Sequence, residues 1–302
     1  MKNKILTAFV LIALLSVHEN VFAAGKIKIV TTTSTLASLS RSIAGDKADI
    51  YFIASPDRDI HFITPTPKDV VKIKKADVFV HGGLDLEAWR GPLLDAVGRS
   101  EFMPAGERAI DASLGIPLLE IPVSLSRLQG DIHAFGNPHY WLDPVNGKIM
   151  AGNIAEGLAR LYPEDADFFR KNAEAFKSQI DLKVKEWEAR MAPYRGQGVI
   201  VYHNSWPYFL NRFGLAMMGS LEPKPGIPPT ASHLNELVAL MKEKKVKVIL
   251  KEVFQENRTS QKAAQETGAS VVTLASEAGE AGGDYLGMIE KNVSNLEKAF
   301  KQ

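Results

Sequence analysis

The chain has 302 residues, of which 45% are hydrophobic and 24% are charged, as is usual for a soluble globular protein with a sizeable core. Its net charge of +1 gives no reason to expect nucleic acid or a strongly charged surface as a partner. The sequence contains no cysteine, which excludes disulfides, thiolate chemistry and cysteine-based zinc sites. Histidine and carboxylate side chains are therefore the strong metal ligands that this chain offers.

The amino terminus has the pattern of a secretory signal. A basic start is followed by an apolar run over residues 5–17, and Val21-Phe22-Ala23 fits a cleavage site of small residues. The apolar run is shorter than the roughly 20 residues that span a bilayer. We expect residues 1–23 to be removed and the mature protein to be free in the periplasm or secreted. Because no cysteine follows the cleavage site, we expect no acyl-lipid anchor.

Strands and helices alternate from residue 26. Runs of β-branched and apolar residues predict strands over 26–34, 48–54 and 77–80, and helices are expected over 36–44, from Pro67, and over 86–97. Alternation at this spacing indicates right-handed βαβ units and a parallel sheet. Residues 104–138 contain several prolines and little periodicity, so we expect them to be loosely ordered.

A long amphipathic helix is expected over residues 164–191, after a shorter one over 146–161. Its apolar residues recur in steps of three, four or seven, as one buried helix face requires; they are Phe169, Ala173, Phe176, Ile180, Val184, Trp187 and Met191. At 1.5 Å per residue the helix would run roughly 40 Å, which is the diameter of a small domain or more.

A second α/β series follows the long helix. The strands are expected at 198–203, 215–220, 246–253 and 270–275, and the helices at 207–213, 231–244, 259–267 and 285–300. The predicted fold is α/β, with two lobes that contain parallel-type sheets and are joined by one long rigid helix. We divide the chain into a signal peptide (1–23), an amino-terminal lobe (24–162), a linking helix (163–193) and a carboxyl-terminal lobe (194–302).

The segment Gly136-Asn137-Pro138-His139-Tyr140-Trp141-Leu142-Asp143-Pro144 is the most informative stretch of the sequence. Pro138 restricts the backbone before His139, and the aromatic residues that follow are expected to be buried. Asp143 is suited to cap a helix that begins at Pro144. A histidine on such a stiff turn suits a metal site, although a lone histidine at such a place is more often an ordinary core residue.

Three other residues make a metal site the better interpretation of His139. His61 lies in the loop after the second strand, His203 ends a strand of the second lobe, and Glu277 follows the last strand. Open α/β sheets bind their ligands at the carboxyl ends of strands, so these residues and His139 could converge in a cleft between the lobes. Three neutral imidazoles and one carboxylate suit tetrahedral zinc. Taken singly, His61 could be a solvated side chain and Glu277 a surface carboxylate. We expect His81 and His233 to be structural, and His133 could touch the metal weakly.

These residues lie in motifs that resemble those of the periplasmic zinc/manganese-binding receptors of ABC transporters. The resemblance covers essentially all of the mature chain and rests on His61-Phe62-Ile63-Thr64-Pro65-Thr66-Pro67, Gly83-Leu84-Asp85-Leu86-Glu87-Ala88-Trp89, Pro138 to Pro144, His203, and Pro225-Gly226-Ile227-Pro228-Pro229-Thr230. It implies two α/β lobes joined by a rigid helix. It also implies a transported Zn²⁺, with Mn²⁺ or Fe²⁺ as alternatives, and an inner-membrane ABC permease as partner. A periplasmic metal donor is a further conceivable partner, and we expect a monomer.

By this resemblance His61, His139 and His203 fall on the family's first three metal ligands and Glu277 on the acidic fourth. The chain has Glu at that fourth position instead of the usual Asp, so Asp284 remains an alternative. Histidine at position 203 resembles the zinc-binding members, whereas manganese-binding members tend to have Glu there. The long loop rich in histidine and acidic residues, frequent before the central motif in zinc-binding members, is reduced here to Asp131 and His133.

Two other classes of function were weighed against a metal receptor. A zinc hydrolase could use the three histidines with Glu252 as general base if water held the fourth position, but the chain lacks a His-Glu-x-x-His helix. A siderophore or haem receptor on a similar frame gives no reason for three converging histidines. We therefore expect a binding protein that is not an enzyme.

Overall fold

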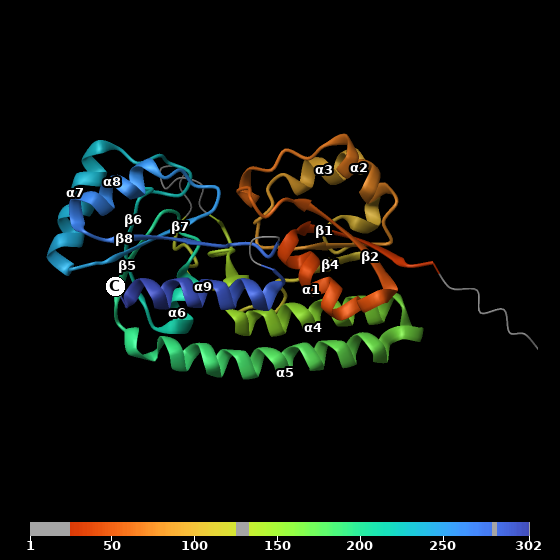
Figure 1. The fold of residues 1–302 in the computed structure, drawn as a ribbon. Coiled ribbons are helices and arrows are strands. Elements are labelled where there is room, and N and C mark those ends of the chain that lie inside the picture. Colours follow the sequence, from red (N-terminus) through yellow and green to blue (C-terminus); the bar gives the residue numbers. More distant parts are fainter. Residues whose placement is uncertain (1–24, 125–132, 280–282, 302) are drawn as a thin grey trace, which may run out of the picture.

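The computed structural model describes residues 25–124, 133–279 and 283–301. The expected signal peptide lies outside these residues. The described chain forms two α/β lobes above a layer of long helices (Figure 1). None of the helices in the described part of the chain is both long and apolar enough to cross a membrane.

The amino-terminal lobe contains a parallel sheet of four strands in the order β2-β1-β3-β4. These strands are β1 (Ile27–Thr33), β2 (Ala48–Ala54), β3 (Val78–His81) and β4 (Ala109–Asp111). Its helices are α1 (Ser34–Ala44), α2 (Pro67–Lys74) and α3 (Arg90–Val97). The short strand β4 lies in a segment that we expected to be loose, because three residues give no periodicity that a sequence could reveal.

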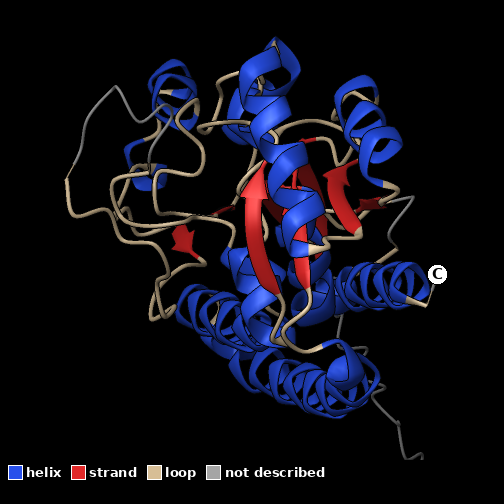
Figure 2. Cartoon of the chain, turned by 90° about the vertical axis from the view of Figure 1, so that its left-hand side faces the viewer, coloured by secondary structure: helices blue, strands red, loops and turns tan. Residues whose placement is uncertain are grey.

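The carboxyl-terminal lobe repeats this arrangement, with strand order β6-β5-β7-β8 and parallel pairing throughout. Its strands are β5 (Gly198–Val201), β6 (Ala216–Ser220), β7 (Val248–Glu252) and β8 (Ser270–Leu274). Its helices are α6 (Pro207–Phe213), α7 (Ala231–Lys244) and α8 (Arg258–Thr267). Viewed from the side of this lobe, helices lie on both sides of the strands (Figure 2). In both sheets the first strand lies between the second and the third, so the chain leaves it in opposite directions, and such a switch point is where open α/β sheets bind ligands.

Three further helices form the layer below the lobes: α4 (Pro144–Leu161), α5 (Ala166–Met191) and α9 (Tyr285–Phe300). Helix α5 has 26 residues and runs below both lobes, with α4 and α9 above it (Figure 1). It contacts α1 of the first lobe and α6 of the second as well as α4 and α9. All seven apolar residues of its predicted face are buried. The long helix that joins the lobes is thus confirmed.

One continuous apolar core connects the two lobes through these helices. It includes β1 residues such as Ile29, β5 residues such as Val199, and residues of α5 and α9 such as Trp187 and Leu296. A second, smaller core lies in the carboxyl-terminal lobe around Leu237 and Ile249. Moving one lobe far from the other would expose part of the shared core, which opposes wide hinge motion.

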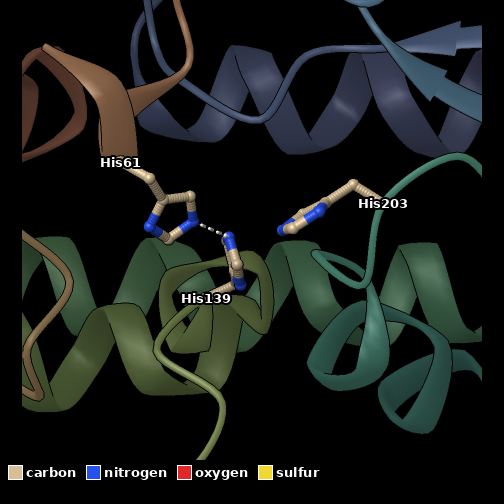
Figure 3. Close-up of side chains that lie close together, drawn as sticks. All are labelled: His61, His139 and His203. Atoms are coloured by element: carbon tan, nitrogen blue, oxygen red, sulfur yellow. Dashed lines mark hydrogen bonds between the residues drawn. The ribbon is translucent and has the colours of Figure 1, made fainter. Parts of the chain in front are cut away.

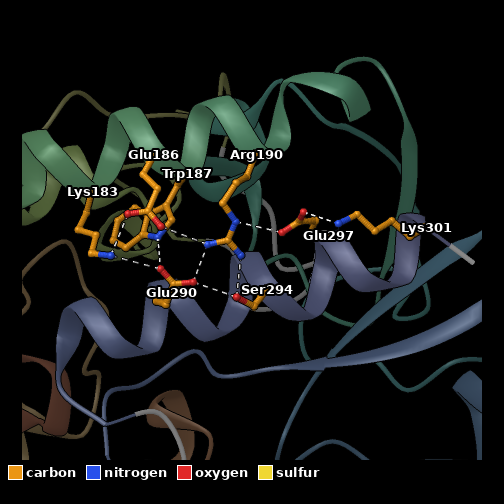
Figure 4. Close-up of polar contacts among 8 residues, drawn as sticks. All are labelled: Lys183, Glu186, Trp187, Arg190, Glu290, Ser294, Glu297 and Lys301. Atoms are coloured by element: carbon orange, nitrogen blue, oxygen red, sulfur yellow. Dashed lines mark hydrogen bonds and ion pairs between the residues drawn. The ribbon is translucent and has the colours of Figure 1, made fainter.

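Helices α5 and α9 are also joined by polar contacts. Arg190 donates from Nη1 to Glu290 Oε1 over 2.6 Å, from Nε to Glu297 Oε2 over 3.0 Å, and from Nη2 to Ser294 Oγ over 2.7 Å. Trp187 Nε1 donates to the other oxygen of Glu290 over 2.8 Å. Lys183, Glu186 and Lys301 extend the group at its two ends (Figure 4).

Candidate metal centre

The segment that carries His139 is fixed by burial and by its own polar contacts. Tyr140 and Leu142 are fully buried, and a short 3₁₀ turn spans Tyr140–Leu142. Asp143 caps α4 by accepting from the Val145 backbone N–H, with Pro144 in the first helical turn. The predicted cap is therefore confirmed, and its consequence is a rigid position for the preceding His139.

Hydrogen bonds tie this segment to both lobes. Tyr140 Oη donates to the carbonyl of Gly82 in the amino-terminal lobe over 2.6 Å. Trp141 Nε1 donates to the carbonyl of Ser276, after β8, over 2.6 Å. Tyr208 Oη of α6 donates to the Asn137 carbonyl over 2.9 Å. His139 is consequently held at the junction of the two lobes.

His61 and His203 approach His139 from opposite lobes (Figure 3). His61 lies in a 3₁₀ turn, Ile60–Phe62, whose start is capped by the Asp59 side chain. His203 lies two residues beyond the end of β5 at Val201, in a turn and not in the strand as we expected. Leu221 and Glu222 N–H groups still bind the carbonyls of Val201 and Tyr202, so the chain stays beside the end of β6 as it enters the bend that carries His203.

The three imidazoles converge. One ligand atom from each of His61, His139 and His203 can be chosen so that all lie within 4.8 Å of one another. The Nε2 atoms of His61 and His139 are 2.9 Å apart. In a tetrahedral zinc site the nitrogens would be ~3.3 Å apart, given metal–nitrogen distances of about 2.0–2.1 Å. Side-chain shifts of roughly an ångström would therefore bring the nitrogens to the spacing of a tetrahedral zinc site.

Hydrogen bonds to Nδ1 orient two of these rings before any ion arrives. His139 Nδ1 is 3.0 Å from Asn137 Oδ1, and His203 Nδ1 is 2.7 Å from Glu222 Oε2. Both partners are acceptors, so Nδ1 carries the proton and the Nε2 lone pair faces the cleft. Such partners fix the tautomer and raise the basicity of a metal-ligating histidine. Neither Asn137 nor Glu222 was identified from the sequence. The Asn-Pro-His run could have suggested Asn137, but Glu222 is distant in the chain.

The electrostatic surroundings keep two of the rings neutral. Burial lowers the pKa of His61 to about 3, with His133 and His203 adding to the effect. Burial also lowers the pKa of His139 well below its usual value. Burial also lowers the pKa of His203. The hydrogen bond to Glu222 and the charges of Glu252, Glu222 and Asp59 outweigh this effect, so the pKa is raised overall. His203 is thus the ring of these three that protonates first, and zinc would displace its proton.

Glu277 lies apart from the three-histidine group. Its Oε2 accepts from Ser34 Oγ over 3.1 Å and from the Thr35 backbone N–H over 2.9 Å, at the amino terminus of α1. Burial raises its pKa to about 7 despite these bonds. Its Oε1 has no hydrogen-bond partner among the described residues. The structure therefore brings together three of the four expected ligands and places the fourth on a helix terminus.

The other acidic residues named from the sequence also have defined places. Asp284 caps α9 by accepting from the Gly287 N–H and lines a separate cavity with Glu277. Glu252 is fully buried at the end of β7, and burial raises its pKa to about 7, with the His203 charge acting against that rise. His81 and His233 lie outside the group, and His233 Nε2 is 2.8 Å from the Ser220 carbonyl oxygen.

Known proteins resemble this chain over most of its length. A family model described as "Zinc-uptake complex component A periplasmic" matches residues 29–299. The iron-binding protein YfeA of Yersinia pestis is 27% identical over 92% of this chain and 88% of its own length. The manganese ABC transporter substrate-binding lipoprotein PsaA of Streptococcus mitis is 26% identical over 96% and 94%. The zinc-binding protein AdcA of Streptococcus pyogenes is 25% identical over 98% of this chain, which spans only 61% of that protein.

Solved structures share the fold. The crystal structure of a ZnuA deletion mutant with zinc bound superposes with a TM-score of 0.77 at 26% identity, covering 91% of this chain and 98% of the other. The match to the family model extends over nearly the whole described chain, including both lobes and all three histidines. The protein therefore belongs to the family of the periplasmic component A of zinc-uptake complexes, and it is a metal-binding substrate-binding protein of an ABC transporter for zinc, manganese or iron.

Proposed function

We propose that the protein captures one Zn²⁺ ion per chain in the periplasm and delivers it to an ABC permease for import. The observation that carries this proposal is the convergence of three imidazoles within 4.8 Å, two of them with their Nε2 lone pairs turned to the cleft by hydrogen bonds at Nδ1. The basic and apolar start of the chain supports secretion through a cleaved signal, without an acyl anchor because no cysteine follows.

The donor set favours zinc over manganese. Imidazole nitrogen suits zinc, whereas manganese prefers carboxylate, carbonyl and water oxygens with a higher coordination number. Manganese and iron remain the alternatives, since relatives named for both metals share the whole length of the fold. We propose that the ion is cargo and not a catalyst, because the relatives are binding components of transporters.

For the fourth ligand, the residue expected from the sequence does not lie beside the three histidines. The sequence proposes Glu277, and the free Oε1 of this residue supports it. To reach the ion, however, its carboxylate would have to weaken its two hydrogen bonds at the start of α1. Glu277 therefore stays a proposal to be tested.

We also propose that binding and release involve small movements. The lobes, residues 24–162 and 194–302, share one apolar core and are linked through residues 163–193, so loop shifts around the histidines cost less than lobe separation. A monomer would suffice, since one chain supplies all three imidazoles.

Zinc affinity of a His139→Ala variant tests the proposed function. We expect it to weaken binding by more than the roughly 10–100-fold that loss of a ligand's hydrogen-bond partner costs. The measurement is a competition titration against a chelator, with Mn²⁺ and Fe²⁺ run in parallel. His233→Ala, which removes a histidine outside the group, is the matched control. Unchanged zinc affinity in His139→Ala would remove the central claim.

A further inference from the structure

A second cavity lies in the amino-terminal lobe, apart from the metal centre. Its volume is about 460 Å³, a size that is usual for the binding pockets of small molecules. The described residues that line it include none of the three converging histidines. They do include five titratable side chains, which come from β3, β4, α3, α4 and a loop: His81, Arg90, Glu107, Asp111 and Arg160.

His81 is buried in the wall of this cavity. It is the last residue of β3, where it pairs with Asp111 of β4, and its ring centre lies 6.3 Å from that of Phe79 on the same strand face. Only 4% of His81 is exposed, and no described residue forms a hydrogen bond with its buried Nδ1. We expected a structural histidine at this position, but a buried structural histidine normally has such a partner.

Arg90, at the start of α3, provides a second buried nitrogen without a partner. No described residue accepts a hydrogen bond from its Nη1. The charge of Arg90 acts on buried Glu87, but Glu87 Oε1 accepts instead from Thr32 Oγ and the Gly82 N–H, over 2.6 Å in each case. A buried guanidinium group is stabilised by an acceptor, and carboxylate and phosphate oxygens match its planar geometry. Arg90 and His81 thus bring two unpaired nitrogens to one cavity.

The charges around the cavity suit a ligand with one acid group. Arg90 and Arg160 are cationic and Glu107 and Asp111 are anionic, so a ligand with several acid groups would be repelled by two carboxylates. Burial and the charge of Arg90 lower the pKa of His81 to about 4, while Asp111 acts against this effect. The ring is therefore neutral at pH 7, and an anion beside Nδ1 would favour the tautomer that carries its hydrogen there.

We propose that this cavity binds a small anion with one acid group, either a carboxylate or a phosphate, whose oxygens accept from Arg90 Nη1 and His81 Nδ1. Arg160 is exposed in the last turn of α4, so it would meet the anion from the solvent side. The inference concerns a site separate from the three histidines. It does not depend on the proposed function.

Nuclear magnetic resonance of the histidine rings in the zinc-free full protein tests this inference, with His81→Gln to identify the His81 signal. Inorganic phosphate or propionate, exchanged for chloride at constant ionic strength, should shift this signal along a saturating curve. Arg90→Gln should weaken binding by roughly tenfold or more, since it removes a charged donor. Arg160→Gln should weaken it less, because Arg160 is exposed. Arg170→Gln, which removes an exposed guanidinium outside the cavity, is the matched control and should bind as the wild type does.

Thermal unfolding provides a second measurement. A bound anion should raise the unfolding midpoint of the wild type and of Arg170→Gln but not that of Arg90→Gln. If Arg90→Gln does not fold, Arg90→Lys replaces it. Lysine keeps the charge but lacks the planar pair of donors, so this variant should also bind the anion more weakly than the wild type does.

The two probes distinguish the acid groups. Saturable binding of phosphate alone or of propionate alone would identify the group that the cavity accepts. No saturable shift of the His81 signal with either probe would mean that water satisfies both nitrogens, and it would overturn the inference. Equal affinity in the wild type and in the Arg90 variant would overturn it as well. Either of these last two results would leave the proposed capture of zinc untouched, because zinc affinity is measured separately.

Discussion

Arg190→Met should destabilise the protein in a way that depends on pH, because Arg190 holds Glu290 ionised between α5 and α9. Burial acts to raise the pKa of Glu290, but hydrogen bonds from Arg190, Trp187 and Ser294 lower it from 4.5 to about 2. A difference of about 2.5 pH units corresponds to ~3.4 kcal/mol at 1.36 kcal/mol per unit. The Glu290 side chain is 35% exposed, and the variant keeps the bonds from Trp187 and Ser294, so screening and this remaining share reduce the contribution of Arg190 to roughly 1–2 kcal/mol. Methionine keeps most of the apolar stem and removes only the guanidinium.

The direction with pH follows from the lowered pKa. A carboxylate whose folded-state pKa is depressed stabilises the fold fully above its unfolded pKa, here 4.5, and progressively less as the pH falls towards 2. Thermal unfolding followed by circular dichroism should therefore show a lower midpoint for Arg190→Met at pH 7, by about 2–4 °C per kcal/mol, and a smaller difference at pH 3.

Arg170→Met is the matched control for this experiment. Arg170 also binds a glutamate, Glu156, through two hydrogen bonds of 2.8 and 2.7 Å, but the two side chains are 52% and 61% exposed. Exposed pairs contribute about 0.2–1 kcal/mol, so its midpoint should change little. Equal losses in the two variants, or an Arg190→Met difference that stays constant from pH 7 to pH 3, would refute the reasoning.

Two further predictions concern the site and the movement of the lobes. Glu222→Gln should weaken zinc binding at neutral pH by roughly 10–100-fold, because His203 loses its charged partner. Zinc affinity should fall as the pH falls and His203 becomes protonated. In Glu222→Gln this loss should begin at lower pH, because the hydrogen bond and charge of Glu222, which raise the pKa of His203 together with the charges of Glu252 and Asp59, are gone. Titrations between pH 8 and pH 5 measure both effects, and an unaltered pH profile would contradict the assignment. Solution scattering should show nearly the same radius of gyration with and without zinc, and a change as large as that of a hinged sugar receptor would mean that α5 and the shared core do not restrain the lobes.

The sequence predicted the fold well where periodicity was strong. The apolar face of α5 and the capped start of α4 have clear signals, a regular spacing of large apolar residues and an Asp-Pro pair. The three-residue strand β4 has no such signal, and β5 ends at Val201 although the run that predicted the strand continues to His203. Local patterns specify elements, whereas strand ends are decided by partners far along the chain.

The sequence predicted those parts of the candidate site that lie in motifs resembling the family. His61, His139 and His203 do converge, as expected. The position of Glu277 could not be predicted, because it depends on which free donors at the start of α1 the carboxylate meets. The role of Glu222 was also hidden, since it lies 19 residues from the histidine that it binds.

The three histidines differ in how firmly they are held, which bears on how an ion could leave. His139 lies in a buried segment bound to Gly82, Ser276 and Tyr208, so it moves only if contacts to both lobes break. His203 lies in a turn, and its ring has one polar anchor that the structure describes, Glu222, on the same lobe. It is also the ring of these three on which a proton competes most strongly with a metal. Release should therefore begin at His203, through a local shift of its turn, while His139 and the shared core stay in place.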